Sequence, residues 1–181
     1  MSWDLKSFLI VIFIFPILGF SQGKVSSANF KSLAECPSGS QSKVDQVDLF
    51  LQGVFQKVKE SKEVYSWEME DAHHRTPRYC VDECACIQKK YIAALKTSPV
   101  KGIEILGIRL SGGQGILPVE IKHGEHIASY FYHNATMVKF AADNCYIIAD
   151  PIMNKDLLSP YDWANNIASL DENTIFVWAE K

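Results

Sequence analysis

The spacing of hydrophobic residues predicts two amphipathic helices in the first half of the chain. Residues 44–61 and 84–98 both place apolar side chains three to four positions apart, the period of a helix with one buried face. Asp82 precedes the second segment as a candidate N-cap, and Pro99 ends it. The apolar positions that define the two faces are Val44, Val47, Leu51, Val54 and Val58 in the first segment and Ile87, Tyr91, Ala94 and Leu95 in the second.

The second half of the chain changes to the patterns of strands. Residues 102–110 are rich in β-branched side chains, residues 118–133 predict one or two strands, and residues 139–151 contain another. A short helix is expected within residues 159–170 and a last strand at 174–179. Helices followed by antiparallel-looking strands predict an α+β fold.

The N-terminal end has the pattern of a secretory signal. Residues 8–20 form an apolar run that is too short to cross a bilayer, and the small residues Gly19 and Ser21 fit a cleavage site after Ser21. We therefore expect residues 1–21 to be a signal peptide and the mature protein to be secreted or periplasmic. An uncleaved anchor is the alternative, because the run is preceded by one Lys and one Asp.

The remaining chain divides into an arm and one domain. Residues 22–43 are rich in Ser and Gly, which predicts a flexible N-terminal arm, and residues 44–181 are expected to fold as a single domain. Hydrophobic residues make up 48% of the sequence and charged residues 22%, as in ordinary globular proteins. A net charge of −3 without a Lys/Arg cluster argues against a nucleic-acid partner. No membrane partner is expected after signal cleavage.

The cysteines are crowded at one point. Of the five in the chain, Cys80, Cys84 and Cys86 lie within seven residues, directly before or at the start of the second helix. In an oxidising compartment such cysteines form disulfides. They are also candidates for a metal site or for a reactive nucleophile, and their spacing alone matches no common metal pattern.

A Cys–His–Asp triad is the sharpest chemical hypothesis. Cys84 opens a helix, where unpaired backbone N–H groups favour the thiolate, and Cys86 in the same turn is its rival. His126 begins a predicted strand, and Asp150 ends the next one. Adjacent strands would bring these two side chains together in front of Cys84. Residues 44–181 would then be a catalytic domain.

The other histidines have simpler interpretations. His73 and His74 lie in a polar loop and are expected at the surface. His123 stands beside Gly124, in a turn or bulge. His133 has the opposite strand parity to His126, so the two would point to opposite faces. For Asp150, the competing interpretation is a turn residue before Pro151.

These residues resemble the secreted bacterial protein-glutaminases, or protein-glutamine deamidases, which are papain-like and transglutaminase-like. The resemblance extends over residues 45–170 as short motifs in order. Where that family has a bulky aromatic residue after its cysteine, this chain has Ala85. The matching positions are Arg78, Tyr79, Val81, Asp82 and Cys84, the "HIA" at His126, the Asp-Pro at Asp150, and the downstream Pro160 and Trp163.

The resemblance implies deamidation of protein-bound glutamine to glutamate through a Cys84 thioester, with release of ammonia. His126, oriented by Asp150, would transfer the protons. No cofactor and no metal would be needed. The backbone N–H of Cys84 would be one oxyanion donor, and a second donor is required. The partners would be a glutamine-containing protein or peptide substrate and an inhibitory or immunity protein, since the chain has no room for the folded pro-region of that family.

Three alternatives remain open. A transglutaminase or a cysteine peptidase would use the same triad. A secreted, disulfide-stabilised binding protein would have no catalysis. A zinc site would combine Cys80, Cys84 and Cys86 with His73 or His74. For an enzyme with Cys84 free, we expect Cys80 and Cys86 to be bonded one to Cys36 and one to Cys145.

Overall fold

The computed structural model describes residues 23–61, 83–112, 119–123, 126–154, 156–168 and 170–180. Helices cover antiparallel sheets, as the pattern of the sequence predicted for an α+β fold. None of the helices in this described part is long and apolar enough to span a membrane. The expected signal peptide lies outside it.

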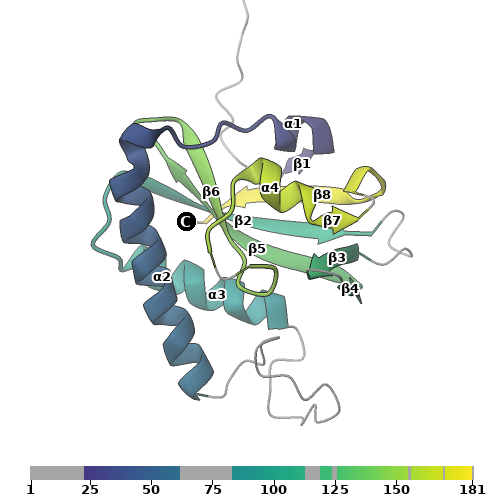
Figure 1. Cartoon of the computed structure of the whole chain (residues 1–181), viewed down its shortest axis with the longest axis horizontal. Coiled ribbons are helices and arrows are strands. Elements are labelled where there is room, and N and C mark those ends of the chain that lie inside the picture. The colour runs from purple at the N-terminus through teal and green to yellow at the C-terminus, as the bar shows by residue number, and fades with distance from the viewer. Residues whose placement is uncertain are drawn as a thin grey trace, which may run out of the picture.

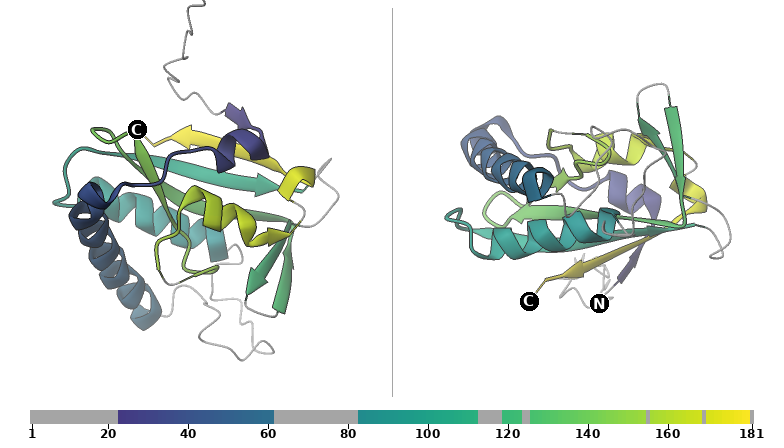
Figure 2. Two further views of the ribbon diagram at one scale, coloured as in Figure 1. Left: turned by 45° about the horizontal axis from the view of Figure 1, so that its top comes forward. Right: turned by 90° about the horizontal axis from the view of Figure 1, so that it is seen from below.

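The strands form a large and a small sheet, and every strand pair is antiparallel (Figure 1). The large sheet has the order β1-β8-β2-β5-β6, and its strands are β1 (Gly23–Val25), β2 (Ile103–Ser111), β5 (Tyr132–Phe140), β6 (Cys145–Ala149) and β8 (Thr174–Ala179). The small sheet has the order β4-β3-β7, with β3 (Val119–His123), β4 (His126–Tyr130) and β7 (Ile167–Ala168). The β3–β4 hairpin projects from one end of the large sheet (Figure 2).

Two long helices and several short ones surround the sheets. Both predicted amphipathic helices are present, as α2 (Gln41–Ser61) and α3 (Glu83–Lys96), with the predicted apolar faces turned inward. The short helix α4 (Pro160–Asn165) is capped by Ser159, whose side chain accepts a hydrogen bond from the Asp162 N–H. The remaining short helices are α1 (Ser27–Lys31), η1 (Ser38–Ser40) and η4 (Leu170–Glu172).

The alternation of side chains along the strands divides the core into two clusters. Met137 on β5 and Ile148 on β6 pack with α4 and the small sheet, whereas their neighbours Val138 and Ile147 pack with α2 and α3. Strands buried on both faces read as continuous hydrophobic runs, as β6 does.

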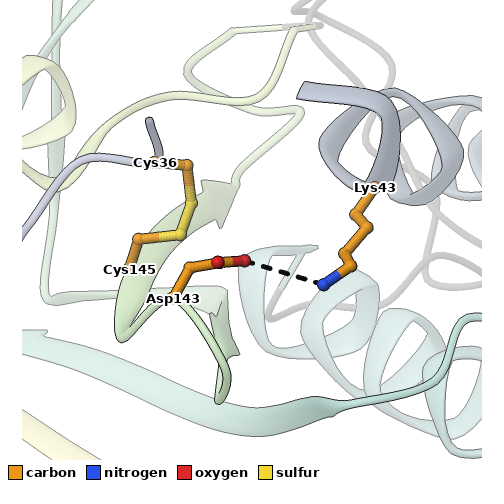
Figure 3. Close-up of a disulfide and its surroundings, with 4 residues drawn as sticks. All are labelled: Cys36, Lys43, Asp143 and Cys145. Atoms are coloured by element: carbon orange, nitrogen blue, oxygen red, sulfur yellow. Dashed lines mark ion pairs between the residues drawn. A yellow bond between two sulfur atoms is a disulfide. The ribbon is translucent and has the colours of Figure 1, made fainter. Parts of the chain in front are cut away.

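The expectation of a flexible N-terminal arm is wrong for the residues that the structure describes. Strand β1 pairs with β8, Phe30 of α1 is fully buried against Trp163, and Cys36 is bonded to Cys145. Figure 3 shows this disulfide beside the ion pair between Lys43 of α2 and Asp143 of the β5–β6 turn, 3.6 Å apart. The Ser and Gly content misled because a segment without helical or strand periodicity can still be fixed by pairing at its ends.

Residues 118–133, for which one or two strands are predicted, contribute to three strands. Strands β3 and β4 form a hairpin, and the chain then bends at Phe131, whose side chain is 95% exposed, before β5 begins in the other sheet. Residues before and after this bend therefore belong to different sheets, and strand parity does not carry across it.

Candidate active site

Cys84 is the second residue of α3 and is a free thiol. Its side chain is 6% exposed and faces the sheet. The first N–H groups of a helix have no partner within it, so the backbone around Cys84 presents donors and a partial positive charge. The predicted placement of this cysteine at a helix start is confirmed, although the predicted N-cap, Asp82, lies outside the described residues.

Gln88 fixes the first turns of α3 on the sheet. Its side chain is buried, and its Nε2 donates to the carbonyl oxygens of Ile108, at 3.0 Å, and Ala135, at 2.6 Å. These two residues are paired across β2 and β5. One amide thus joins the helix to two strands. Gln88 is four positions after Cys84 on α3, and its acceptor Ala135 is two positions after His133 on β5.

His133 is the histidine that meets the aspartate. It lies on β5 and is completely buried, with Nε2 2.5 Å from Oδ2 of Asp150. The last pairing between β5 and β6 joins Thr136 to Ala149, so β5 extends past the end of β6. Asp150 follows β6 directly and bends back towards that extension.

Asp150 is held from several sides. Its Oδ2 also accepts a hydrogen bond from Nε1 of Trp163 on α4, at 2.8 Å, and its Oδ1 accepts one from the Met153 N–H, at 3.3 Å. The carboxylate is 3% exposed, and Trp163 is fully buried against the His133 ring. These contacts leave the carboxylate one orientation, in which it faces the imidazole.

The His133 ring also interacts with Cys84. No group in the described residues forms a regular hydrogen bond with Nδ1, and the Cys84 thiol interacts with the ring. Burial is the largest influence on the imidazole and lowers its pKa. The Asp150 carboxylate, by its charge and hydrogen bond, and Cys84 outweigh burial and raise the pKa of His133 from 6.5 to about 9. The ring is therefore an imidazolium at neutral pH.

A narrow recess lies beside Cys84 and Asp150. It has no room for a water molecule. Its lining residues are Cys84, Ile87, Gln88, Asn134, Ala135, Ala149, Asp150, Pro151 and Ile152.

The prediction of His126 as the partner of Asp150 is wrong. His126 begins β4, where its backbone pairs with His123 in the small sheet, while the carboxylate of Asp150 is occupied by His133 and Trp163. The comparison of strand parity between positions 126 and 133 is valid only if both residues lie on one continuous strand. The bend at Phe131 places them on two strands in different sheets. The parity comparison therefore set aside the histidine that contacts Asp150.

One sequence signal does identify His133. The stretch Ala141–Asn144 is a four-residue turn between two hydrophobic runs, and Asn144 adopts a positive φ of 49° there. If the pairing of β5 with β6 is continued beyond Thr136 and Ala149, position 133 lies opposite the residues just after Asp150. Trp163 was noted only as a match to a family motif, and no pattern indicated its hydrogen bond to Asp150.

The expected cysteine pairing is also wrong. Cys36 is bonded directly to Cys145, with 4.8 Å between their Cα atoms, and Cys86 forms a different disulfide whose partner lies outside the described residues. The expectation that Cys84 stays free is confirmed. A bonded Cys86 is unable to serve as a zinc ligand or as a nucleophile, which removes the zinc alternative and the rival to Cys84. His73, His74 and Cys80 lie outside the described residues.

Comparisons with protein-family models, curated proteins and solved structures found no match for this chain. Within the described residues, no group of three or more His, Cys, Asp or Glu side chains is arranged to hold a metal ion. A free cysteine, an imidazolium and a buried carboxylate that follow one another in space are suited to nucleophilic attack on a carbonyl group.

Proposed function

We propose that the protein is a cysteine amidohydrolase that deamidates glutamine side chains of proteins, with Cys84, His133 and Asp150 as its catalytic residues. The position of His133 carries the proposal, because Nε2 of the ring contacts Asp150 and the same ring interacts with the free cysteine Cys84. A cysteine at the start of a helix that packs on an antiparallel sheet is the architecture expected of papain-like and transglutaminase-like enzymes, and that fold is part of the proposal.

The choice of glutamine as substrate comes from the sequence resemblance. The matches at residues 78–84 and at Asp150–Pro151 support it, whereas the "HIA" match at His126 does not coincide with the histidine beside Asp150. A chain with disulfides favours an oxidising compartment, so we propose a secreted or periplasmic enzyme. Its partners would be a glutamine-containing protein and a separate inhibitory or immunity protein.

The reaction has two half-steps. The attacking form is the Cys84 thiolate paired with the His133 imidazolium. The thiolate attacks the carbonyl carbon of the glutamine carboxamide, and the imidazolium gives its proton to the nitrogen, which leaves as ammonia when the C–N bond breaks. Water then attacks the thioester, and His133 takes its proton. The C–S bond breaks, so glutamate and the thiolate are released. The net change is one carboxamide and one water converted to one carboxylate and one ammonium ion.

The surrounding groups would lower the barrier of both half-steps. Backbone N–H groups at the start of α3, including that of Cys84, would donate hydrogen bonds to the carbonyl oxygen as it becomes negative. Asp150, held by Trp163 and the Met153 N–H, would keep the imidazolium oriented through the reaction. The burial of His133 and Asp150 strengthens these interactions.

The test is to incubate the mature chain with a glutamine-containing protein and to measure ammonia and product mass. Deamidation releases ammonia and raises the mass by about one dalton per converted glutamine, and Cys84→Ala should lower the rate by about a thousandfold or more. A fluorescent primary amine in the same reaction separates the alternatives. Incorporation of the amine would favour a transglutaminase, and shortened polypeptides a peptidase.

Ammonia release that Cys84→Ala does not change would contradict the proposal. A wild-type protein that produces neither ammonia, crosslinks nor cleavage with several glutamine-containing substrates would favour the non-catalytic binding protein.

A further inference from the structure

Asn134 is the unexplained polar residue at the site. It follows His133 on β5, is 8% exposed, and its side-chain Oδ1 has no hydrogen-bond partner among the described residues. Successive residues on a strand point to opposite faces, so Asn134 points to the side of α3 and lines the recess with Cys84.

No neighbouring group satisfies this oxygen. The amide of Gln88, which also lines the recess from α3, donates instead to the carbonyls of Ile108 and Ala135. Water is excluded, because the recess has no space for it. A buried acceptor without a donor costs about 1–3 kcal/mol relative to an apolar side chain of the same shape. A purely structural role for Asn134 leaves that cost unexplained.

We propose that Asn134 recognises the carboxamide of the substrate, with its Oδ1 accepting an N–H from the –NH2 group that Cys84 will release. The inference rests on the proposed function and names the group that selects its substrate. The carboxamide would reach Oδ1 when the recess opens on binding. The product carboxylate has two acceptor oxygens and no N–H, so Oδ1 repels it. One side chain thus favours entry of glutamine and departure of glutamate.

Alkylation of Cys84 tests this recognition without depending on turnover. Iodoacetamide carries a carboxamide and iodoacetate a carboxylate, and both react with the thiolate at the same carbon. The measured quantity is the ratio of their rate constants at Cys84, followed by peptide mass spectrometry. A ratio cancels any change in the reactivity of the thiol itself.

We expect Asn134→Leu to lower the iodoacetamide-to-iodoacetate ratio by about tenfold, the equivalent of one lost hydrogen bond. The matched control is Thr136→Val, because Thr136 lies on the same face of β5 and its Oγ1 is also buried without a described partner, but it does not line the recess. Thr136→Val should leave the ratio unchanged. If Asn134→Leu does not fold, as judged by its thermal melt, Asn134→Ala replaces it.

The outcomes separate this inference from the proposed function. A ratio that is the same in the wild type and in the Asn134 variant overturns the inference, even if the protein releases ammonia. A fall in the ratio that is specific to Asn134 supports carboxamide recognition, even if no protein-bound glutamine is converted. A fall in Thr136→Val as large as that in Asn134→Leu also overturns it, because the effect would then come from the strand and not from the recess.

Discussion

The two ring nitrogens of His133 have different surroundings, and this difference defines the chemistry at the residue scale. Nε2 is 2.5 Å from the Asp150 carboxylate, which is held by the Trp163 indole N–H, while the rest of the ring faces the Cys84 thiol. A fully buried imidazole would ordinarily lose its proton. Here the carboxylate keeps it protonated, so a proton is available beside Cys84, the proposed nucleophile.

His133→Ala should abolish ammonia release, with a loss of about a thousandfold or more, because the thiolate loses its partner and the leaving group loses its proton donor. His126→Ala is the matched control, since it removes the histidine that begins β4 in the small sheet, and it should change the rate by less than about threefold. Steady-state kinetics on the two purified variants shows which of the two histidines the reaction requires. Equal losses, or a larger loss in His126→Ala, would reverse the assignment.

The raised pKa of His133 predicts how activity and stability change with pH. The folded protein binds the proton more tightly than the unfolded chain, whose histidine has a pKa of 6.5. The stabilisation is therefore complete below pH 6.5 and is lost as the pH rises through about 9. We expect kcat to fall on the alkaline side near pH 9, and Asp150→Asn to move that fall to lower pH. An alkaline limit near pH 6.5 in the wild type would show that the carboxylate does not hold the proton.

At the scale of elements, the site depends on how α3 is attached to the sheet. Cys84 is placed by the start of the helix, His133 by β5 and Asp150 by the end of β6. The hydrogen bonds of Gln88 connect the first of these elements to the second. The strands themselves are connected by the short hairpin whose turn contains Asn144 at positive φ.

Gln88→Leu should lower the free energy of unfolding by about 2–4 kcal/mol, because the carbonyls of Ile108 and Ala135 lose their donor in a buried environment. Gln52→Leu is the comparison. The Gln52 amide also donates one hydrogen bond, to Asp48, but at the exposed surface of α2, so the change should stay within about 0.5 kcal/mol. Denaturant titration of both variants gives the difference. Similar values for the two would mean that Gln88 does not fix the helix.

At the scale of the whole molecule, the N-terminal segment closes the structure. It adds β1 to the edge of the large sheet, buries Phe30 against Trp163, and is bonded to the start of β6 through Cys36 and Cys145, 109 positions apart in sequence. The same strand ends at Asp150. The disulfide therefore restrains the strand that leads to Asp150, the carboxylate of the proposed site.

Replacing both Cys36 and Cys145 by Ala should lower the free energy of unfolding by about 4–5 kcal/mol, the value for so long a closed loop in the chain-entropy model. The comparison is Lys43→Ala, which breaks the ion pair between α2 and Asp143 in the turn just before Cys145. This pair is partly exposed, so its loss should lower the free energy of unfolding by less than about 1 kcal/mol. Thermal and urea unfolding measure both. A double variant as stable as the wild type would show that β1 and α1 hold the segment without the disulfide.

The sequence by itself determined the features that are set by neighbouring residues. The helical spacing of Val47, Leu51 and Val58 placed α2, and the position of Cys84 at the start of α3 followed from the apolar face after it. Asp150 was located because an apolar run ended at an Asp-Pro pair. Each of these depends on a period or a boundary that can be read within about fifteen residues.

Only the tertiary structure decided which side chains meet. His133 replaces His126 because the bend at Phe131 assigns β4 and β5 to different sheets, and Cys36 bonds Cys145 because β1 and α1 bring the N-terminal segment to the start of β6. Strand pairing and disulfide choice depend on contacts between distant residues, and no local period encodes them. The hydrogen bonds of Asp150 with Trp163 and of Gln88 with the sheet are also contacts between distant residues. Each forms because the fold buries the two polar groups next to each other.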